Sequence, residues 1–202
     1  MLVLLLLSWG AALPAMAEDG YDLWLRYRPL PAPVLKQYRD LGGQVVAPAQ
    51  TGTQRATRDE LVRGLAGLLG REPGQAARVQ RNGAIVVGTP ASVPQLSALQ
   101  GDLEGLGEEG YLIRSTRLDG RAATVVAANS DIGALYGTFH LLRLLQAGEP
   151  LAGLDLREVP KVKVRVLNHW DNLDRYVERG YAGESIWDWH KLPDWLDPRY
   201  TD

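Results

Sequence analysis

The feature that most constrains the fold of this chain is an Asp-Gly pair between two runs of strand-forming residues. These runs are residues 111–118 and 121–128. Asp119 and Gly120, which join them, tolerate the positive backbone angles that a two-residue hairpin turn requires. The sequence therefore predicts two antiparallel strands connected by a tight turn.

A helix is predicted directly after this hairpin. Asn129 or Ser130 can cap it, and apolar side chains recur at helical spacing from about Asp131 to Gln146. Gly133 and Gly137 share one face of this helix, and each costs about 1 kcal/mol relative to alanine. Close packing of the helix backbone against the sheet would compensate for that cost. The alternative is a weak, kinked helix.

Strands and helices also alternate upstream of the hairpin. Residues 21–27 alternate like a half-buried strand, and residues 34–41 have helical spacing. Thr57 and Glu60 form a capping-box pattern before a leucine-rich helix, and residues 84–87 read as a buried strand. The predicted fold class is therefore α/β (α+β), with a mixed sheet and packed helices.

Composition narrows the possible functions. The chain has 202 residues, of which 46% are hydrophobic, so it can bury a normal core. Its formal charge of -2 argues against nucleic acid as a partner, because phosphate binding needs clustered Lys and Arg. The absence of cysteine excludes disulfides and thiolate sites.

Residues 1–17 have the pattern of a signal peptide. An apolar run from Leu2 to Leu7 is followed by Ala15-Met16-Ala17, which predicts cleavage before Glu18. We expect export to the periplasm or the extracellular space, with no membrane attachment after cleavage. No Lys or Arg precedes the apolar run, so an apolar N-terminal helix or a membrane anchor is the alternative.

The last third of the chain combines indoles with carboxylates and amides. Residues 163–167 alternate like a strand and lead into the polar run 168–172, and four of the six tryptophans lie between Trp170 and Trp195. Sugars present apolar faces that stack on indoles and hydroxyls that need paired donors and acceptors. This region therefore predicts a carbohydrate site.

The ionisable side chains of this region allow several interpretations. Asp171, Asp174 and Glu178 have helical spacing beside Arg175, which favours a salt-bridged helix face. Asp171 lies nearer the strand end, where it either contacts substrate or orients Arg175. The three histidines are too scattered for a metal pair, so no metal site is predicted.

Longer runs resemble a known family. Residues 168–175, 177–183 and 185–187 resemble the start of the catalytic barrel in α-glucuronidases of glycoside hydrolase family 67. Upstream, residues 84–88 and 130–137 resemble the N-terminal α/β domain of that family, which is similar to the accessory domains before β-hexosaminidase barrels. After the predicted signal peptide at 1–17, the resemblance implies this N-terminal domain at 18–150 and the first strand and helix of an incomplete (β/α)8 barrel at 151–202.

The resemblance also implies an activity. The family consists of exo-acting, inverting hydrolases that remove glucuronic acid or its 4-O-methyl ether from xylo-oligosaccharides in xylan breakdown, without a metal or cofactor. Their catalytic carboxylates lie on later barrel strands, so no residue here is assigned as catalytic. The expected substrate-binding residues are Trp170, as a pocket wall, and Asn168, Asp171 and Asn172. For Trp187 and Trp189, the pocket rim and packing of the first barrel helix remain equal alternatives.

Three hypotheses for this chain follow. It is the N-terminal portion of an α-glucuronidase that acts on glucuronoxylan-derived oligosaccharides and is inactive alone, since a (β/α)8 barrel needs about 250 residues. Alternatively, it is a noncatalytic module that binds carbohydrate through its tryptophans. In the third hypothesis it is a docking domain that completes a barrel whose remainder lies on a separate chain.

Overall fold

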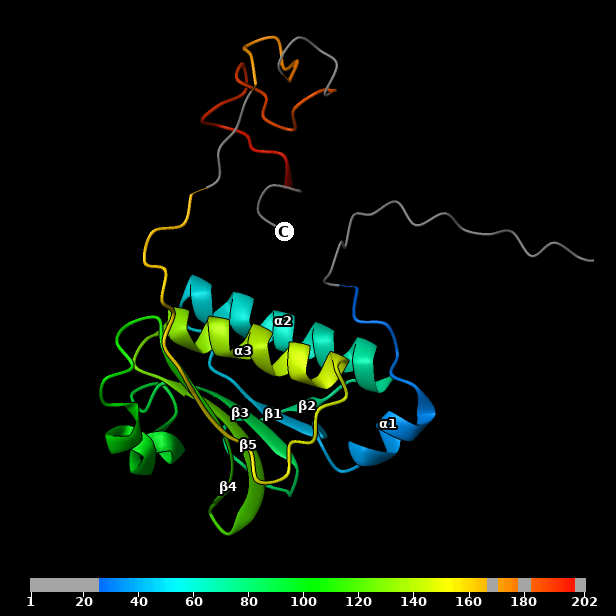
Figure 1. Cartoon of the computed structure of the whole chain (residues 1–202), viewed down its shortest axis with the longest axis vertical. Helices are drawn as coiled ribbons and strands as arrows, with labels where there is room; N and C mark the ends of the chain where they lie inside the picture. The colour runs from blue at the N-terminus through cyan, green and yellow to red at the C-terminus, as the bar shows by residue number, and fades with distance from the viewer. Residues whose placement is uncertain (1–25, 167–170, 178–182, 199–202) are drawn as a thin grey trace, which may run out of the picture. The chain divides into compact units, whose positions relative to one another are not determined.

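The computed structural model of the chain describes residues 26–166, 171–177 and 183–198. The described residues 26–165 form one compact unit, and the described residues from Val166 onward belong to a second. The first unit is a mixed α/β domain built on a six-stranded sheet (Figure 1). The predicted signal peptide at 1–17 lies outside the described residues.

The predicted hairpin is confirmed. Strand β4 spans Tyr111–Leu118 and strand β5 spans Arg121–Ala128, and they pair antiparallel along their whole length. Asp119 and Gly120 both have positive φ angles, 49° and 76°, as a tight hairpin turn requires. This hairpin supplies two neighbouring strands of the sheet.

The other strands extend the sheet on both sides of the hairpin. The strand order is β2-β1-β3-β5-β4-β6, in which β1, β2, β3 and β5 run parallel and β6 runs antiparallel to β4. The predicted buried strand at 84–87 is confirmed as β3, whereas the short strands β1, β2 and β6 were not predicted. Their bounds are Gln44–Val46 for β1, Gly74–Gln75 for β2, Ala84–Gly88 for β3 and Asp155–Glu158 for β6.

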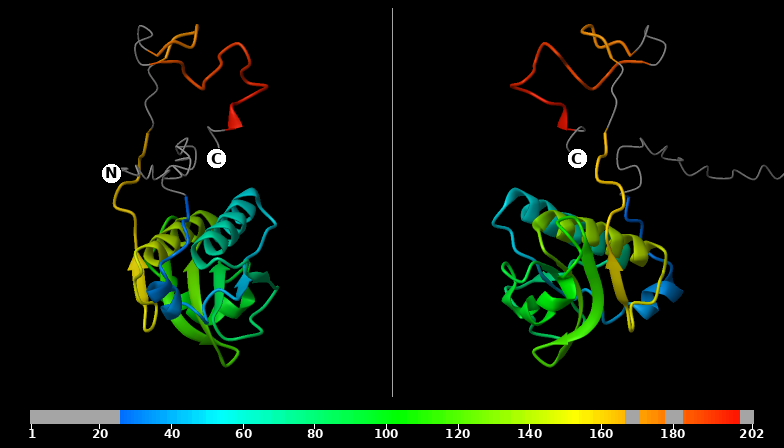
Figure 2. Two further views of the ribbon diagram at one scale, coloured as in Figure 1. Left: turned by 90° about the vertical axis from the view of Figure 1, so that its right-hand side faces the viewer. Right: turned by 60° about the vertical axis from the view of Figure 1, so that its left-hand side comes forward.

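Helices cover one face of the sheet, and a shorter helix lies against the other (Figure 2). Helix α2, Gly52–Leu69, and helix α3, Asp131–Gln146, pack their leucines against Ile85 and Val126 of the sheet. On the opposite face, the 3-10 helix η1, Pro94–Leu103, covers a second apolar cluster. The sheet is thus buried between two cores.

Helix α2 begins earlier than the sequence pattern predicted. Its N-cap is Thr51, whose hydroxyl accepts a hydrogen bond from the backbone of Gln54 at 3.1 Å. The Gln54 side-chain oxygen in turn accepts from the backbone N–H of Thr51. The capping box predicted at Thr57 and Glu60 is therefore wrong. Thr57 lies inside the helix and donates its hydroxyl to the carbonyl of Thr53 at 2.8 Å.

Helix α3 has the predicted bounds and cap. The Ser130 hydroxyl accepts from the backbone of Gly133 at 3.2 Å. The close approach predicted from the two glycines is also confirmed: a Cβ atom at Gly137 would lie 2.4 Å from the Val126 side chain, and one at Gly133 would lie 2.5 Å from the Gly110 carbonyl oxygen. The glycines let the helix backbone rest directly on the hairpin strands.

Three predicted elements need correction. Of the predicted strand 21–27, the described residues Arg26 and Tyr27 lie outside any strand. The helix predicted at 34–41 is shorter and earlier: α1 spans Ala32–Gln37, with Pro31 as its N-cap and Tyr38 as its C-cap.

The predicted strand at 163–167 is the third correction. Residues 163–166 have no strand pairing among the described residues, and Val164 and Val166 are 77% and 80% exposed. A strand needs a neighbour to take its backbone hydrogen bonds. In place of pairing, Arg165 is held by a two-fold ion pair to Glu109 and by stacking over the Tyr136 ring.

Candidate functional site

The predicted carbohydrate site falls in a tryptophan-rich segment, which we define as residues 171–177 and 183–198. Two of its predicted members, Asn168 and Trp170, lie outside the described residues. Asp171 and Asn172 are described, and hydrogen bonds to residues nearby in the sequence hold their side chains in place. Their predicted role in binding substrate stays a prediction.

Residues 171–177 form a tight turn. Asp171 and Val177 pair as an antiparallel bridge, Asn172 donates its side-chain amide to the Tyr176 carbonyl at 2.8 Å, and Arg175 has a left-handed φ of 72°. The predicted salt-bridged helix face is therefore wrong for these residues. Asn and Asp side chains bond the nearby backbone and compete with helix formation, as Asp174 does by accepting from the backbone of Tyr176.

Ser185 joins this turn to the second half of the segment. Its hydroxyl donates to the Asp171 carboxylate at 2.5 Å and accepts from the backbone of Trp187 at 2.9 Å. The Arg175 guanidinium donates to the Ser185 carbonyl at 3.1 Å, and it lies 3.9 Å from the carboxylate of Asp188. Asp171 therefore positions Ser185, while Asp188 is the carboxylate that faces Arg175.

Two tryptophans are among the exposed apolar side chains of this segment. Trp187 and Trp189 meet edge to face with ring centroids 6.0 Å apart, and Trp189 is 41% exposed. Trp195 is exposed to the same extent, with the Lys191 ammonium 4.6 Å from its ring centroid. Exposed indoles of this kind can stack on the apolar faces of sugar rings.

Asp188 and Lys191 are site residues that the sequence reasoning missed. The Lys191 ammonium lies 3.2 Å from the Asp188 carboxylate and, by hydrogen bonding to it, holds the pKa of Asp188 below its usual range. Their separation of three positions was the available signal. The carboxylate and the ammonium group are thus held beside the tryptophans, and these two charged groups can form hydrogen bonds with the hydroxyl groups of a sugar.

The described residues contain no cluster of His, Asp or Glu suited to a metal ion. His140 instead packs in the α/β domain, where its Nδ1 lies 2.9 Å from the Tyr111 hydroxyl and burial lowers its pKa. His169 lies outside the described residues. Among the described helices, none is long and apolar enough to cross a bilayer.

The tryptophan-rich segment places indoles beside carboxylates, which are side-chain types that sugar faces and sugar hydroxyls can contact. Comparison with known families gives a definite assignment. Residues 23–141 match the model of the glycosyl hydrolase family 67 N-terminus, and residues 144–202 match the family 67 middle domain. The chain belongs to glycosyl hydrolase family 67, as the resemblance predicted.

Curated relatives agree with this assignment. The chain is 31% identical over 189 residues to a probable alpha-glucuronidase A from Aspergillus terreus, and 31% identical over 196 residues to alpha-glucuronidase A from Emericella nidulans. The matches cover 92% of this chain and 22% of each relative. An alpha-glucuronidase from Hypocrea jecorina is also 31% identical, with 91% and 23% covered. The chain thus spans less than a quarter of the length of these relatives.

A solved structure is similar to part of the fold. It is a GH115 4-O-methyl-alpha-glucuronidase described as specific for decorated arabinogalactans. The match has a TM-score of 0.42 and 23% sequence identity, and it covers 52% of this chain and 14% of that one.

Proposed function

We propose that this chain forms the N-terminal part of an α-glucuronidase that removes glucuronic acid or its 4-O-methyl ether from xylo-oligosaccharides by inversion. The observation that carries the proposal is the continuous match to two successive family 67 domains. The relatives are named alpha-glucuronidases, which supports an α-linked glucuronic acid as the group removed. Glucuronoxylan-derived oligosaccharides are the proposed partners, and residues 1–17 are the proposed export signal.

The proposed domain organisation has an N-terminal α/β domain at 18–150 and the beginning of a (β/α)8 barrel at 151–202. The exposure of Val162, Val164 and Val166 supports this division. These valines alternate as on one face of a strand, and such an apolar face needs neighbours that cover it. Neighbouring barrel strands, on the same or a separate chain, would supply that cover and pair the backbone of residues 163–167.

In this proposal, Trp170 forms a wall of the glucuronic acid pocket. Asn168, Asp171 and Asn172 lie next to it in sequence and supply hydrogen-bonding groups. The bond between Ser185 and Asp171 supports a fixed position for that carboxylate. Cleavage by inversion needs two carboxyl groups about 6.5 to 9.5 Å apart, and we assign neither of them to these residues.

Turnover measurements test the assignment. The purified 202-residue chain should release no glucuronic acid from aldouronic acids, since a complete barrel holds the catalytic pair. Mixing or co-expression with a chain that carries the remaining family 67 barrel should yield activity. Release by the 202-residue chain alone would contradict the proposal, and so would an assembled pair that stays inactive.

A noncatalytic carbohydrate-binding module is the second candidate. The exposure of Trp189 and Trp195 favours it, because stacking platforms must be accessible. Xylo-oligosaccharides should then change the intrinsic tryptophan fluorescence of the 202-residue chain, and Trp170→Ala should remove the change. Trp195→Ala should reduce the change, because Trp195 is one of the two exposed platforms. A titration without any spectral change would exclude this candidate.

A further inference from the structure

A large hollow in the described part of the α/β domain lies away from the tryptophan-rich segment in sequence. It has a volume of about 1130 Å³ and opens where strands β3 and β5 begin and strand β4 ends. All of its lining residues belong to the compact unit that ends at Arg165. We call it the arginine groove.

The floor of the groove is a part of the sheet with small side chains. Ser115 faces Thr124 and Arg117 faces Ala122 in the antiparallel register, so these four residues share one face. It is the face that carries Ile113 and Val126 under helices α2 and α3 further along the strands. Three of the four, Ser115, Ala122 and Thr124, have small side chains, which leave the hollow.

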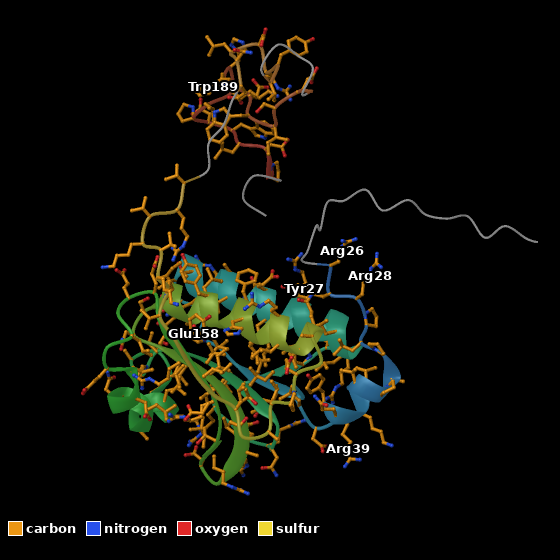
Figure 3. All side chains as sticks on the ribbon, viewed as in Figure 1. Arg26, Tyr27, Arg28, Arg39, Glu158 and Trp189 are labelled. Carbon is orange, nitrogen blue, oxygen red and sulfur yellow. The ribbon has the colours of Figure 1, made fainter. Side chains whose placement is uncertain are left out.

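Two segments wall the groove. One is the end of helix α1, where Arg39 lies (Figure 3), and the other is the loop 150–152 after helix α3. The wall is rigid, because the Tyr38 hydroxyl donates to the Glu149 carbonyl and the Arg71 guanidinium donates to the Arg39 carbonyl at 2.8 Å. The groove is therefore preformed.

Positive charge dominates the lining. Four arginines and one aspartate line the groove, in a chain with a net charge of -2. Arg71 is occupied with backbone carbonyls, which leaves Arg39, Arg81 and Arg117. Arg39 forms only an exposed pair with Asp40 at 3.4 Å, which is worth little in water.

The other two arginines are also available. Arg117 donates one bond, to the Gly120 carbonyl at 2.9 Å, and keeps further N–H groups. Arg81 is exposed, and its guanidinium has no hydrogen-bond partner among the residues that the structure describes. The groove thus offers guanidinium donors from three arginines. On its floor, the Ser115 hydroxyl donates to the Leu151 carbonyl and keeps its capacity to accept a hydrogen bond, whereas Thr124 is buried.

We propose that the arginine groove binds uronic acid-bearing oligosaccharides as a secondary site, separate from the pocket that removes the uronic acid. Guanidinium forks match carboxylates, and hydroxyl side chains match sugar hydroxyls. This proposal rests on the proposed function, which supplies an acidic saccharide as substrate. The site would hold a decorated chain by one branch while another is processed.

The helix C-termini near the groove repel anions, and they repel doubly charged phosphate more than a singly charged carboxylate. Helix α1 ends at Gln37 and helix α2 at Leu69, and both ends lie next to lining residues. Helix C-termini carry partial negative charge, which opposes an anion of higher charge. The anion-attracting N-termini of α2 and α3 lie elsewhere, where Thr51 and Gln54 already bind the Asp131 carboxylate.

Binding measurements on the 202-residue chain test the proposal. The probe is xylotriose that carries one 4-O-methylglucuronic acid, with undecorated xylotriose and inorganic phosphate as comparisons. Dissociation constants come from calorimetry, and amide chemical shifts locate the site. We expect shifts at residues 81–83 and 115–117, and binding that weakens with salt.

Two groove variants and one control decide the outcome. Arg81→Gln with Arg117→Gln should weaken binding of the acidic probe by about 10-fold to 100-fold. Ala122→Glu should also weaken it, because the new carboxylate lies opposite Arg117. Arg58→Gln, on helix α2 outside the groove lining and paired with Asp59, should bind like the unchanged chain. Circular dichroism checks that each variant is folded.

Several results would overturn the proposal. These are an unchanged affinity in the folded double variant, equal binding of undecorated xylotriose, equal binding of phosphate, or no binding of the acidic probe by the unchanged chain. Each concerns the groove alone. The turnover test of the assembled barrel fails or succeeds independently, so failure of the groove and failure of the proposed function are distinguishable.

Discussion

Replacing Gly133 with alanine tests the close contact between helix α3 and the sheet. An alanine Cβ there would lie 2.5 Å from the Gly110 carbonyl oxygen, 3.0 Å from the Glu108 carbonyl oxygen and 3.0 Å from the Ala128 Cβ. Two of these atoms are backbone and the third is fixed to it, so no side-chain rotation relieves the overlap. The helix must move away from the hairpin.

The expected loss follows from two opposing effects. Alanine in a helix interior is favoured over glycine by about 1 kcal/mol. Overpacking a core costs about 1–3 kcal/mol and sometimes more, and contact with backbone places Gly133 at the upper end. Movement of the helix also disturbs the bond from the Gly133 backbone to Ser130. We therefore expect Gly133→Ala to lower the free energy of unfolding by about 2 kcal/mol.

Urea unfolding followed by circular dichroism measures this change. A loss of about 2 kcal/mol corresponds to a decrease of about 4–8 °C in melting temperature for a chain of this size. Gly52→Ala is the matched control, because it also lies in a helix and its added Cβ would meet nothing within 4 Å. If Gly133→Ala proved as stable as the unchanged chain, or Gly52→Ala proved equally damaging, the close-contact reasoning would be refuted.

Two further predictions concern the same helix. Ser130→Ala removes the cap and its bond to the Glu108 carbonyl, so unfolding in urea should show a loss of about 1 kcal/mol, while Ser130→Thr, whose hydroxyl can both accept and donate, should retain more stability. Burial lowers the pKa of His140 in the folded state, so the unfolded chain takes up a proton first. Stability should fall as the pH drops through about 6.5, and His140→Phe should make this decline shallower in pH-dependent melting; an unchanged slope would contradict it.

Much of the α/β domain was predictable from local patterns. The hairpin around Asp119 and the helix after Ser130 were placed correctly, because turn residues and cap residues act on the backbone within a few positions. The capping box predicted at Thr57 was wrong because a better one was available. A second box, at Thr51 and Gln54, lay upstream, and Gln54 gains an additional bond to Asp131 of another helix.

The candidate site was less predictable. Helical spacing of Asp171 and Asp174 indicated a helix, but the backbone turns at Arg175 and pairs with the strand-like residues around Ser185. Periodicity records which residues share a face only if the segment is helical. It does not show whether side chains bond the backbone instead, and this competition decided the local structure.

The amino-acid order alone established the chemistry that acts over short distances: the tight turn at Asp119, the capped helix after it, and the concentration of tryptophans near the end of the chain. The tertiary structure alone decided which distant segments meet. The two-residue strand β2, the close contact of Gly133 with Gly110 and the arginine groove all depend on residues far apart in sequence. Such contacts form because the sheet and helices bury their apolar faces together, and local patterns do not encode that long-range choice.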